Sequence, residues 1–265
     1  MNTTTGDQIR EAVRENYGQI AESASSCCDT TSCCTPGAEQ PKLLSLQLGY
    51  SRKDLIAVPE GANLGLGCGN PQAIAKLVPG EVVLDLGSGA GFDCFLAARQ
   101  VGPSGRVIGV DMTAQMIAKA RANAQEADYD NVEFRLGEIE HLPVADASVD
   151  VIISNCVINL SPDKADVFAE AFRVLRPGGR LAVSDVVAFA KIPDEMRNDM
   201  ALLSACISGA EDVGVIVRLL HAAGFVEVLV APKEESKTFM ADWAPGAPIT
   251  DYVVSATIEA RKPAV

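Results

Sequence analysis

A short apolar run that ends in three closely spaced glycines constrains the fold more than any other stretch of the 265-residue chain. It reads VVLDLGSGAG from Val82 to Gly91, and an apolar helical pattern follows it. Glycine has no Cβ and tolerates positive φ, so Gly87, Gly89 and Gly91 let the backbone approach a ligand closely. A strand that turns through such a loop into a helix predicts an α/β fold with a nucleotide-like cofactor at the turn.

The spacing of these glycines differs from that of the dinucleotide-binding loop. The spacing here is Gly-x-Gly-x-Gly rather than Gly-x-Gly-x-x-Gly, and Asp85 stands two residues before the first glycine. Its carboxylate would repel a pyrophosphate and suits a cationic group. The loop resembles the first motif of the S-adenosylmethionine-dependent methyltransferases of Rossmann-like fold, whose cofactor carries an ammonium and a sulfonium group. A glycine-rich turn taken alone also fits an ordinary strand-to-helix connection.

Two later segments agree with this resemblance. The run RVIGVD ends at Asp111, where an acidic side chain after the second strand would meet ribose hydroxyls. In the run VEFRLGEIEHLP, the resemblance implies that Glu138 receives the adenine amino group and that the backbone of Ile139 faces the ring. The full set of expected cofactor residues is Asp85, Gly87, Ser88, Gly89, Gly91, Asp111, Met112, Glu138, Ile139, Asn155 and Val157.

Composition narrows the class of protein. A hydrophobic content of 48% suits one large packed α/β domain. The 35 acidic and 22 basic residues give a net charge of −13, which would repel nucleic acids and anionic membranes. The N-terminus lacks the pattern of a signal peptide, and no stretch approaches the roughly 20 apolar residues of a membrane helix. We therefore expect a cytoplasmic protein with small-molecule or protein partners, and with neither nucleic acid nor membrane as a partner.

The eight cysteines are expected to be thiols, because a reducing compartment disfavours a permanent disulfide framework. Two adjacent pairs, Cys27–Cys28 and Cys33–Cys34, stand in a polar stretch that predicts an exposed loop. Zinc is one interpretation, although structural zinc sites usually separate their ligands by two to four residues. An accessory thiol role and a functionally silent tail are the other two.

Three further cysteines stand in different sequence contexts. Cys68 lies between two glycines, which predicts an unhindered loop thiol. Cys94 falls on the helix after the glycine loop, where a small core residue is the preferred interpretation. Cys156 directly follows the apolar strand predicted for residues 149–154, so we expect it at the crevice beyond the carboxyl ends of the strands.

The remaining pattern predicts the sheet and its helices. Helices are expected over residues 6–23, 113–127, 161–175, 193–208 and 213–223, and strands over 180–187, 225–231 and 252–260, the last suited to an antiparallel edge. Their alternation predicts a Rossmann-like seven-stranded sheet, mostly parallel with one antiparallel strand and helices on both faces. We expect residues 1–48 to form an N-terminal helix and cysteine-rich loop, and residues 49–265 to form the methyltransferase domain with substrate-binding C-terminal elements. Spacing alone makes Cys206, within 193–208, a core residue.

Six segments together resemble the arsenite methyltransferases. They are GLGCGNP, VLDLGSGAGFD, GVDMT, ISNCVINL, RVLRPGGR and ACISGA, of which RPGG is shared by many methyltransferases. In that family three cysteines hold trivalent arsenic, and the resemblance assigns this role to Cys68, Cys156 and Cys206. The family's fourth thiol is a single N-terminal cysteine, so the two pairs at Cys27, Cys28, Cys33 and Cys34 leave its identity open.

The chemistry gives three thiols a physical reason. Trivalent arsenic is soft and selects thiolate ligands. Three thiols can replace the three hydroxyls of arsenous acid, and the arsenic lone pair can then attack the sulfonium methyl, with proximity contributing roughly 7–11 kcal/mol. A lone pair carries no proton, so no general base is required, and neither of the two histidines, His141 and His221, is expected to be catalytic.

The resemblance therefore implies an S-adenosylmethionine-dependent enzyme that methylates arsenite and methylarsenite in arsenic detoxification. It also implies a thioredoxin- or glutathione-type reductant that resolves a disulfide formed in each cycle. Two alternatives remain at this point. One is a methyltransferase for another small nucleophile; the other is a non-enzymatic metalloid- or zinc-binding thiol protein, which would leave Asp85, Asp111 and Glu138 without a purpose.

Overall fold

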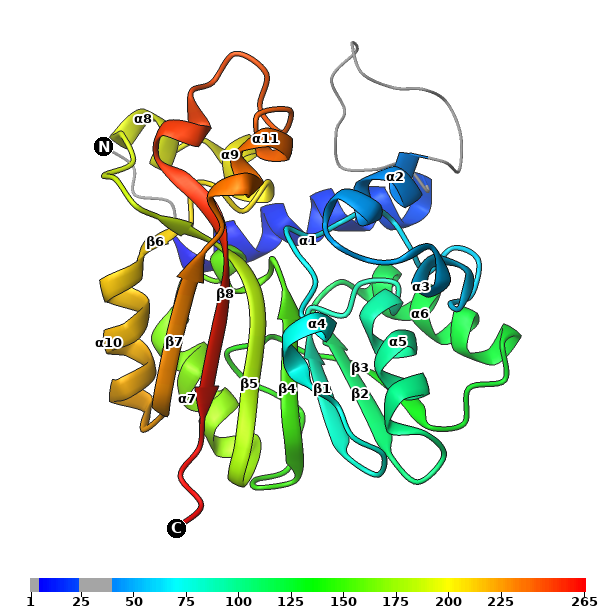
Figure 1. Cartoon of the computed structure of the whole chain (residues 1–265). Coiled ribbons are helices and arrows are strands. Elements are labelled where there is room, and N and C mark those ends of the chain that lie inside the picture. Colours follow the sequence, from blue (N-terminus) through cyan, green and yellow to red (C-terminus); the bar gives the residue numbers. More distant parts are fainter. Residues whose placement is uncertain (1–4, 24–39) are drawn as a thin grey trace.

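The computed structural model describes residues 5–23 and 40–265; the pairs Cys27–Cys28 and Cys33–Cys34 lie outside the described residues. A central sheet runs in the order β3-β2-β1-β4-β5-β8-β7, and a two-residue strand, β6, pairs with β5 (Figure 1). The strands are β1 Val82–Leu86, β2 Arg106–Asp111, β3 Val132–Leu136, β4 Val149–Asn155, β5 Leu175–Ala188, β6 Glu211–Asp212, β7 Val226–Pro232 and β8 Val253–Arg261.

Strands β1 to β5 pair with one another in parallel, and β8 is antiparallel to both β5 and β7. This arrangement confirms the predicted Rossmann-like sheet with one reversed strand. The prediction that the last strand forms an edge is wrong: β8 lies between β5 and β7, and β7 is the edge. The reason is visible in burial, because residues 253–258 of β8 are all buried, as expected of a strand covered on both faces.

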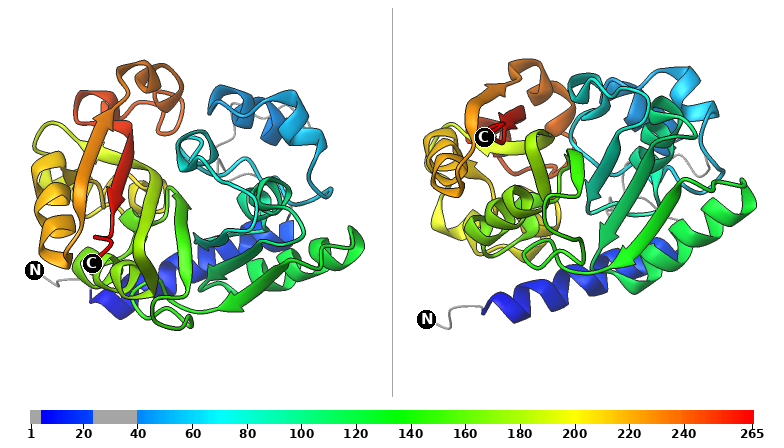
Figure 2. Two further views of the ribbon diagram at one scale, coloured as in Figure 1. Left: turned by 60° about the horizontal axis from the view of Figure 1, so that its bottom comes forward. Right: turned by 90° about the horizontal axis from the view of Figure 1, so that it is seen from below.

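Two helical layers flank this sheet (Figure 2). Helices α5 and α6 pack on the face that carries Val83 and Val107, and α7 and α10 pack on the face that carries Leu84 and Ile108, because successive strand residues point to opposite faces. The helices are α1 Gly6–Ser23, α2 Gln40–Gln47, α3 Arg52–Ile56, α4 Gln72–Ala75, α5 Phe92–Val101, α6 Ala114–Glu126, α7 Lys164–Val174, α8 Asp194–Arg197, α9 Met200–Ser204, α10 Val213–Ala223 and α11 Lys237–Met240. Short 3-10 turns are η1 Ile158–Leu160, η2 Glu234–Ser236 and η3 Ile249–Asp251.

No helix in the described part of the chain combines the length and the apolarity that a membrane span needs.

The first helix, α1, runs across the carboxyl ends of the parallel strands (Figure 1). The predicted helix over residues 6–23 matches it, and its apolar side buries Val13, Ile20 and Ala21. Val13 packs in a cluster that also holds Cys68, Cys156 and Cys206, while Ile20 and Ala21 pack against Ala90 of the glycine loop. One helix therefore covers both the glycine loop and the cysteine segments.

The region predicted as one helix over residues 193–208 is instead two short helices, α8 and α9, and this prediction is corrected. The Asp199 side chain accepts hydrogen bonds from the N–H groups of Ala201 and Leu202, so a new helix begins there. Cys206 lies beyond the end of α9, in a turn with φ of 62°. A cysteine in a turn can point its thiol into a site that a regular helix would not reach.

Candidate functional site

The glycine loop after β1 has the geometry of a ligand cradle. Gly87 has a φ of 68°, and a Cβ at this position would lie 2.2 Å from a methyl of Val157, so only glycine fits. A Cβ at Gly89 would meet nothing within 4 Å, which leaves open space above the loop. The buried Ser88 hydroxyl has no hydrogen-bond partner among the described residues. An open cradle with an unpartnered buried hydroxyl fits a polar ligand lying on the loop.

Asp111 at the end of β2 binds both the glycine loop and the segment that follows β2. Its carboxylate accepts hydrogen bonds from the Gly89 N–H at 3.0 Å and from the Thr113 N–H at 2.8 Å. Burial raises the pKa of Asp111, and these two N–H groups oppose that rise. The structure thus places Asp111 beside the glycine loop, where the sequence predicts it.

A cavity of about 430 Å³ extends from this point between the segments that follow β2 and β3. Its size falls within the roughly 300–1,000 Å³ of small-molecule sites. Met112 and Glu138, both predicted, line it, and Ile139 is buried directly after Glu138. Arg14 of α1 also lines the cavity and forms an ion pair with Glu138. The sequence pattern does not single out Arg14, because its charge is equally consistent with the solvated side of an amphipathic helix.

Asp85 lies beneath the loop rather than in the cavity. Its side chain is buried and accepts a hydrogen bond from the Cys94 thiol, with 3.2 Å between sulfur and oxygen. Burial, followed by the nearby charge of Asp93, raises the pKa of Asp85 well above its ordinary range. Cys94 is buried in the core, as predicted, and serves Asp85 as a partner.

The three predicted arsenic ligands lie in one buried cluster, although the Cys206 sulfur stands outside the group of ligand atoms that Cys68 and Cys156 form with Asp185. The Cys68 and Cys156 sulfurs and a carboxylate oxygen of Asp185 all lie within 4.8 Å of one another. The Cys206 thiol donates a hydrogen bond to the Cys156 carbonyl at 2.7 Å. All three cysteines are free and buried, so the predicted unhindered thiol at Cys68 is wrong: that residue is 1% exposed. Its loop is hydrogen-bonded to β8 through Ser255 and to the end of β4 through Asn155.

The backbone of Cys68 is fixed by two side chains. Its N–H donates to Asn155 Oδ1 at 3.0 Å, and its carbonyl accepts from the Ser255 hydroxyl at 2.7 Å. Asn155 also donates to the Gly69 carbonyl at 2.9 Å. The sequence analysis expected Asn155 at the cofactor, whereas the structure places its amide on the Cys68 loop. Ser255, which lies in an alternating strand of otherwise ordinary pattern, was missed.

The other two thiols sit on strained backbone. Cys156 and Cys206 have φ values of 61° and 62°, which non-glycine residues rarely adopt. Asp185 stabilises the turn after Cys156, because its carboxylate accepts hydrogen bonds from the Ile158 N–H at 3.0 Å and the Asn159 amide at 2.9 Å. No site role was predicted for Asp185. A charged residue within the apolar strand LAVSDVVA nevertheless indicates that a hydrogen-bond or ion-pair partner lies nearby.

The thiol cluster, meaning Cys68, Cys156 and Cys206, is held in an environment that favours neutral groups. Burial raises the pKa of the Cys68 thiol to about 11 and that of Cys156 well above its ordinary value. Burial also raises the pKa of Asp185 to about 6, against the opposing N–H of Val186 and the positive charge of Lys164. Burial therefore favours the neutral thiol at both Cys68 and Cys156.

Comparisons with known proteins agree with this geometry. A family model described as a methyltransferase domain matches residues 77–224. The arsenite methyltransferase of Halobacterium salinarum is 54% identical over 97% of this chain and 68% of its own length. The arsenite methyltransferases of Aquipseudomonas alcaligenes and Homo sapiens are 43% and 36% identical over 83% and 77% of this chain. The chain spans 62% and 54% of these two relatives.

Solved structures give the same result. The arsenic(III) S-adenosylmethionine methyltransferase of Chlamydomonas reinhardtii superposes with a TM-score of 0.63 and 34% identity, covering 86% of this chain and 75% of its own. The geranyl diphosphate C-methyltransferase of Streptomyces coelicolor, at 15% identity and a TM-score of 0.67, covers 96% of this chain and 98% of its own, and shares the fold alone. By its sequence and its fold, the chain belongs to the arsenite methyltransferase family of S-adenosylmethionine-dependent methyltransferases.

Proposed function

We propose that this protein methylates trivalent arsenic, as arsenite and methylarsenite, with S-adenosylmethionine as the methyl donor. The observation that carries the proposal is the position of the thiol cluster beside the cofactor loop. Val157, the residue after Cys156, packs directly against Gly87, and the Cys68 and Cys156 sulfurs lie together. The names of the relatives described above support the same substrate.

The residues of the cavity and loop fit the cofactor. The Ser88 hydroxyl and the space above Gly89 suit its amino-acid part, Asp111 suits the ribose hydroxyls, and Glu138 suits the adenine amino group. When bound, S-adenosylmethionine supplies an electrophilic methyl group on a sulfonium and leaves as a neutral thioether.

The chain's own part in arsenic binding is the exchange of three cysteine thiols for the three hydroxyls of arsenous acid. Each thiol gives its proton to one hydroxyl of arsenous acid, so three waters leave and three As–S bonds form. No additional base is needed, and no net proton is released. The neutral pyramidal product suits a buried site, and its lone pair is held toward the methyl donor by the positions of Cys68, Cys156 and Cys206.

A reduction step completes each cycle. Forming the As–C bond uses the arsenic lone pair and leaves arsenic formally pentavalent. Two cysteine sulfurs then leave arsenic and join as a disulfide. The two As–S bonds that break return two electrons to arsenic, which becomes trivalent again, and water binds at the opened position and releases a proton. A thioredoxin- or glutathione-type thiol, of the kind present in a reducing cytoplasm, reduces that disulfide by exchange. The pairs Cys27–Cys28 and Cys33–Cys34 would capture arsenic or take part in this relay.

The test is methyl transfer from labelled S-adenosylmethionine to arsenite in the presence of a thiol reductant. We compare the natural chain with Cys68→Ser, Cys156→Ser and Cys206→Ser, and measure S-adenosylhomocysteine binding for each as a control for folding. We expect activity in the natural chain, a loss of at least a hundredfold in each variant, and unchanged cofactor-product binding. A natural chain that binds S-adenosylhomocysteine but neither binds nor methylates arsenite would overturn the proposed substrate.

A further inference from the structure

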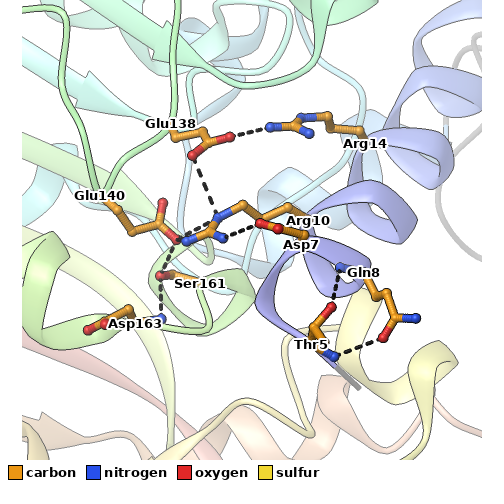
Figure 3. A network of polar contacts seen from close by, with 9 residues as sticks. All are labelled: Thr5, Asp7, Gln8, Arg10, Arg14, Glu138, Glu140, Ser161 and Asp163. Atoms are coloured by element: carbon orange, nitrogen blue, oxygen red, sulfur yellow. Dashed lines mark hydrogen bonds and ion pairs between the residues drawn. The ribbon is translucent and has the colours of Figure 1, made fainter. Parts of the chain in front are cut away.

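Two arginines of α1 reach the glutamates that follow β3 (Figure 3). Arg14 forms an ion pair with Oε1 of Glu138, and Arg10 Nε lies 3.6 Å from Oε2 of the same carboxylate. Arg10 also contacts Glu140 at 3.1 Å, and Glu140 accepts a further hydrogen bond from the Ser161 hydroxyl at 2.7 Å. The Glu138 carboxylate is thus approached by a cation at each of its two oxygens.

This arrangement leaves part of Glu138 available to the cavity. An ionised carboxylate has about four lone-pair sites, and the two arginines approach it from α1. The Glu138 side chain is still 30% exposed, and both Glu138 and Arg14 line the 430 Å³ cavity. A glutamate without these partners would sample several rotamers, so the ion pairs restrict the direction in which its remaining lone pairs point.

We propose that Arg14 is a positioning residue for nucleobase recognition: it holds the Glu138 carboxylate in the orientation that accepts a hydrogen bond from an exocyclic amino group. A base with a carbonyl at that position places its oxygen against a fixed carboxylate and binds less well. The inference rests on the proposed placement of the cofactor in this cavity. It does not depend on arsenic being the substrate.

The attachment of α1 does not depend on Arg14. Val13, Ile20 and Ala21 are buried on its apolar side, and the Tyr17 hydroxyl donates to the Ser204 carbonyl at 3.1 Å. The Arg14 side chain is 42% exposed, and exposed ion pairs contribute little to folding stability. Replacing Arg14 therefore removes the ion pair at Oε1 of Glu138, while Arg10 remains near Oε2, and it leaves the helix in place.

The experiment measures binding of two cofactor products by titration calorimetry in the full chain. S-adenosylhomocysteine carries the amino group, and S-inosylhomocysteine carries a carbonyl in its place. Arg14→Met is compared with a matched control, Arg106→Met, which removes another exposed arginine–glutamate pair, the one with Glu133, that does not line the cavity. Glu138→Gln is the second variant.

We expect the natural chain and Arg106→Met to prefer the adenosyl ligand at least tenfold. Arg14→Met should bind the adenosyl ligand five- to tenfold more weakly and the inosyl ligand almost unchanged, so that the preference shrinks; Glu138→Gln should lose it. Equal weakening of both ligands by Arg14→Met would overturn the inference, as would unchanged or tighter adenosyl binding, which would mean that Arg14 competes with the base. A Glu138→Gln variant that keeps the full preference would overturn it as well.

Discussion

Cys68 is held through its backbone as well as through its surroundings. The Asn155 amide and the Ser255 hydroxyl bind its N–H and its carbonyl, so the thiol is directed before any ligand arrives. Such preorganisation improves ligand binding because less conformational freedom is lost on binding. At the scale of single residues, the hydrogen bonds to this one loop are therefore part of the proposed arsenic site.

Replacing Ser255 tests this role. Ser255→Ala removes the hydrogen bond to the Cys68 carbonyl. A hydrogen bond of this kind contributes about 1 kcal/mol, so its loss should weaken arsenite binding roughly fivefold to tenfold. S-adenosylhomocysteine binding should not change. The matched control is Ser184→Ala on the adjacent strand, since Ser184 is equally buried but its hydroxyl has no partner among the described residues. Equal arsenite affinities in Ser255→Ala and Ser184→Ala would exclude a role for the Ser255 hydrogen bond in arsenite binding.

The residues that follow strands could be predicted from the sequence. Parallel strands end at or shortly before Gly87, Asp111, Glu138 and Cys156, and the carboxyl ends of such strands meet at one edge. The contact between Arg14 and Glu138 could not be predicted, because it joins residues 124 positions apart through the docking of a helix. The hydrogen bond from the Ser255 hydroxyl to the Cys68 carbonyl could not be predicted either, because it depends on the direction of one side chain.

At the scale of elements, the mostly parallel sheet with one reversed strand and most of the helices followed from the sequence, but two elements did not. The pattern over residues 193–208 is helical throughout, yet Asp199 caps a second helix within it. The alternation in β8 suggested an exposed edge, while pairing with both β5 and β7 buried it. Both differences arise from local capping and from tertiary packing, which hydrophobic periodicity does not report.

The glycine loop supports a prediction about two glycines at opposite ends of β1. Gly89→Ala and Gly80→Ala both place alanine at positive φ, which costs about 1–2 kcal/mol of folding stability, and neither Cβ meets a neighbour closer than 3.7 Å. Only the Cβ at Gly89 enters the space above the cofactor loop. We expect S-adenosylhomocysteine binding to weaken at least tenfold in Gly89→Ala and to stay unchanged in Gly80→Ala, with urea unfolding as the check on stability. Equal binding in both variants would mean that the ligand does not occupy that space.

At the scale of the whole molecule, one buried carboxylate joins four separate segments. Asp93 in α5 accepts hydrogen bonds from the Tyr50 hydroxyl at 2.9 Å, from Gln72 at 3.3 Å and from Asn155 at 3.4 Å. Burial raises the pKa of Asp93 to about 6, although the hydrogen bonds oppose the rise. The stability of the whole fold should therefore depend on pH through this residue.

The direction of that dependence is fixed by the pKa shift. Between the ordinary value of 3.8 and about 6, folded Asp93 keeps a proton that the unfolded chain has lost, so its contribution to stability falls as pH rises. The slope is about 1.4 kcal/mol per pH unit for one proton. Urea unfolding between about pH 4 and pH 6 gives the slope of the free energy of unfolding against pH. This slope should be shallower by roughly that amount in Asp93→Asn, and the slope that remains comes from Asp85 and other groups. An unchanged slope in Asp93→Asn would indicate that Asp93 is ionised throughout this range.

The position of α1 across the strand ends has a consequence for biosynthesis. The ribosome releases this helix before any strand, yet Arg14 and Tyr17 find their partners 124 and 187 residues later. Contacts so distant in sequence form late, after the sheet that supports them. On the nascent chain, the hydrogen bond between Tyr17 and Ser204 can form only after Ser204 has emerged, whereas α6 and Glu138, which α1 also contacts, emerge earlier.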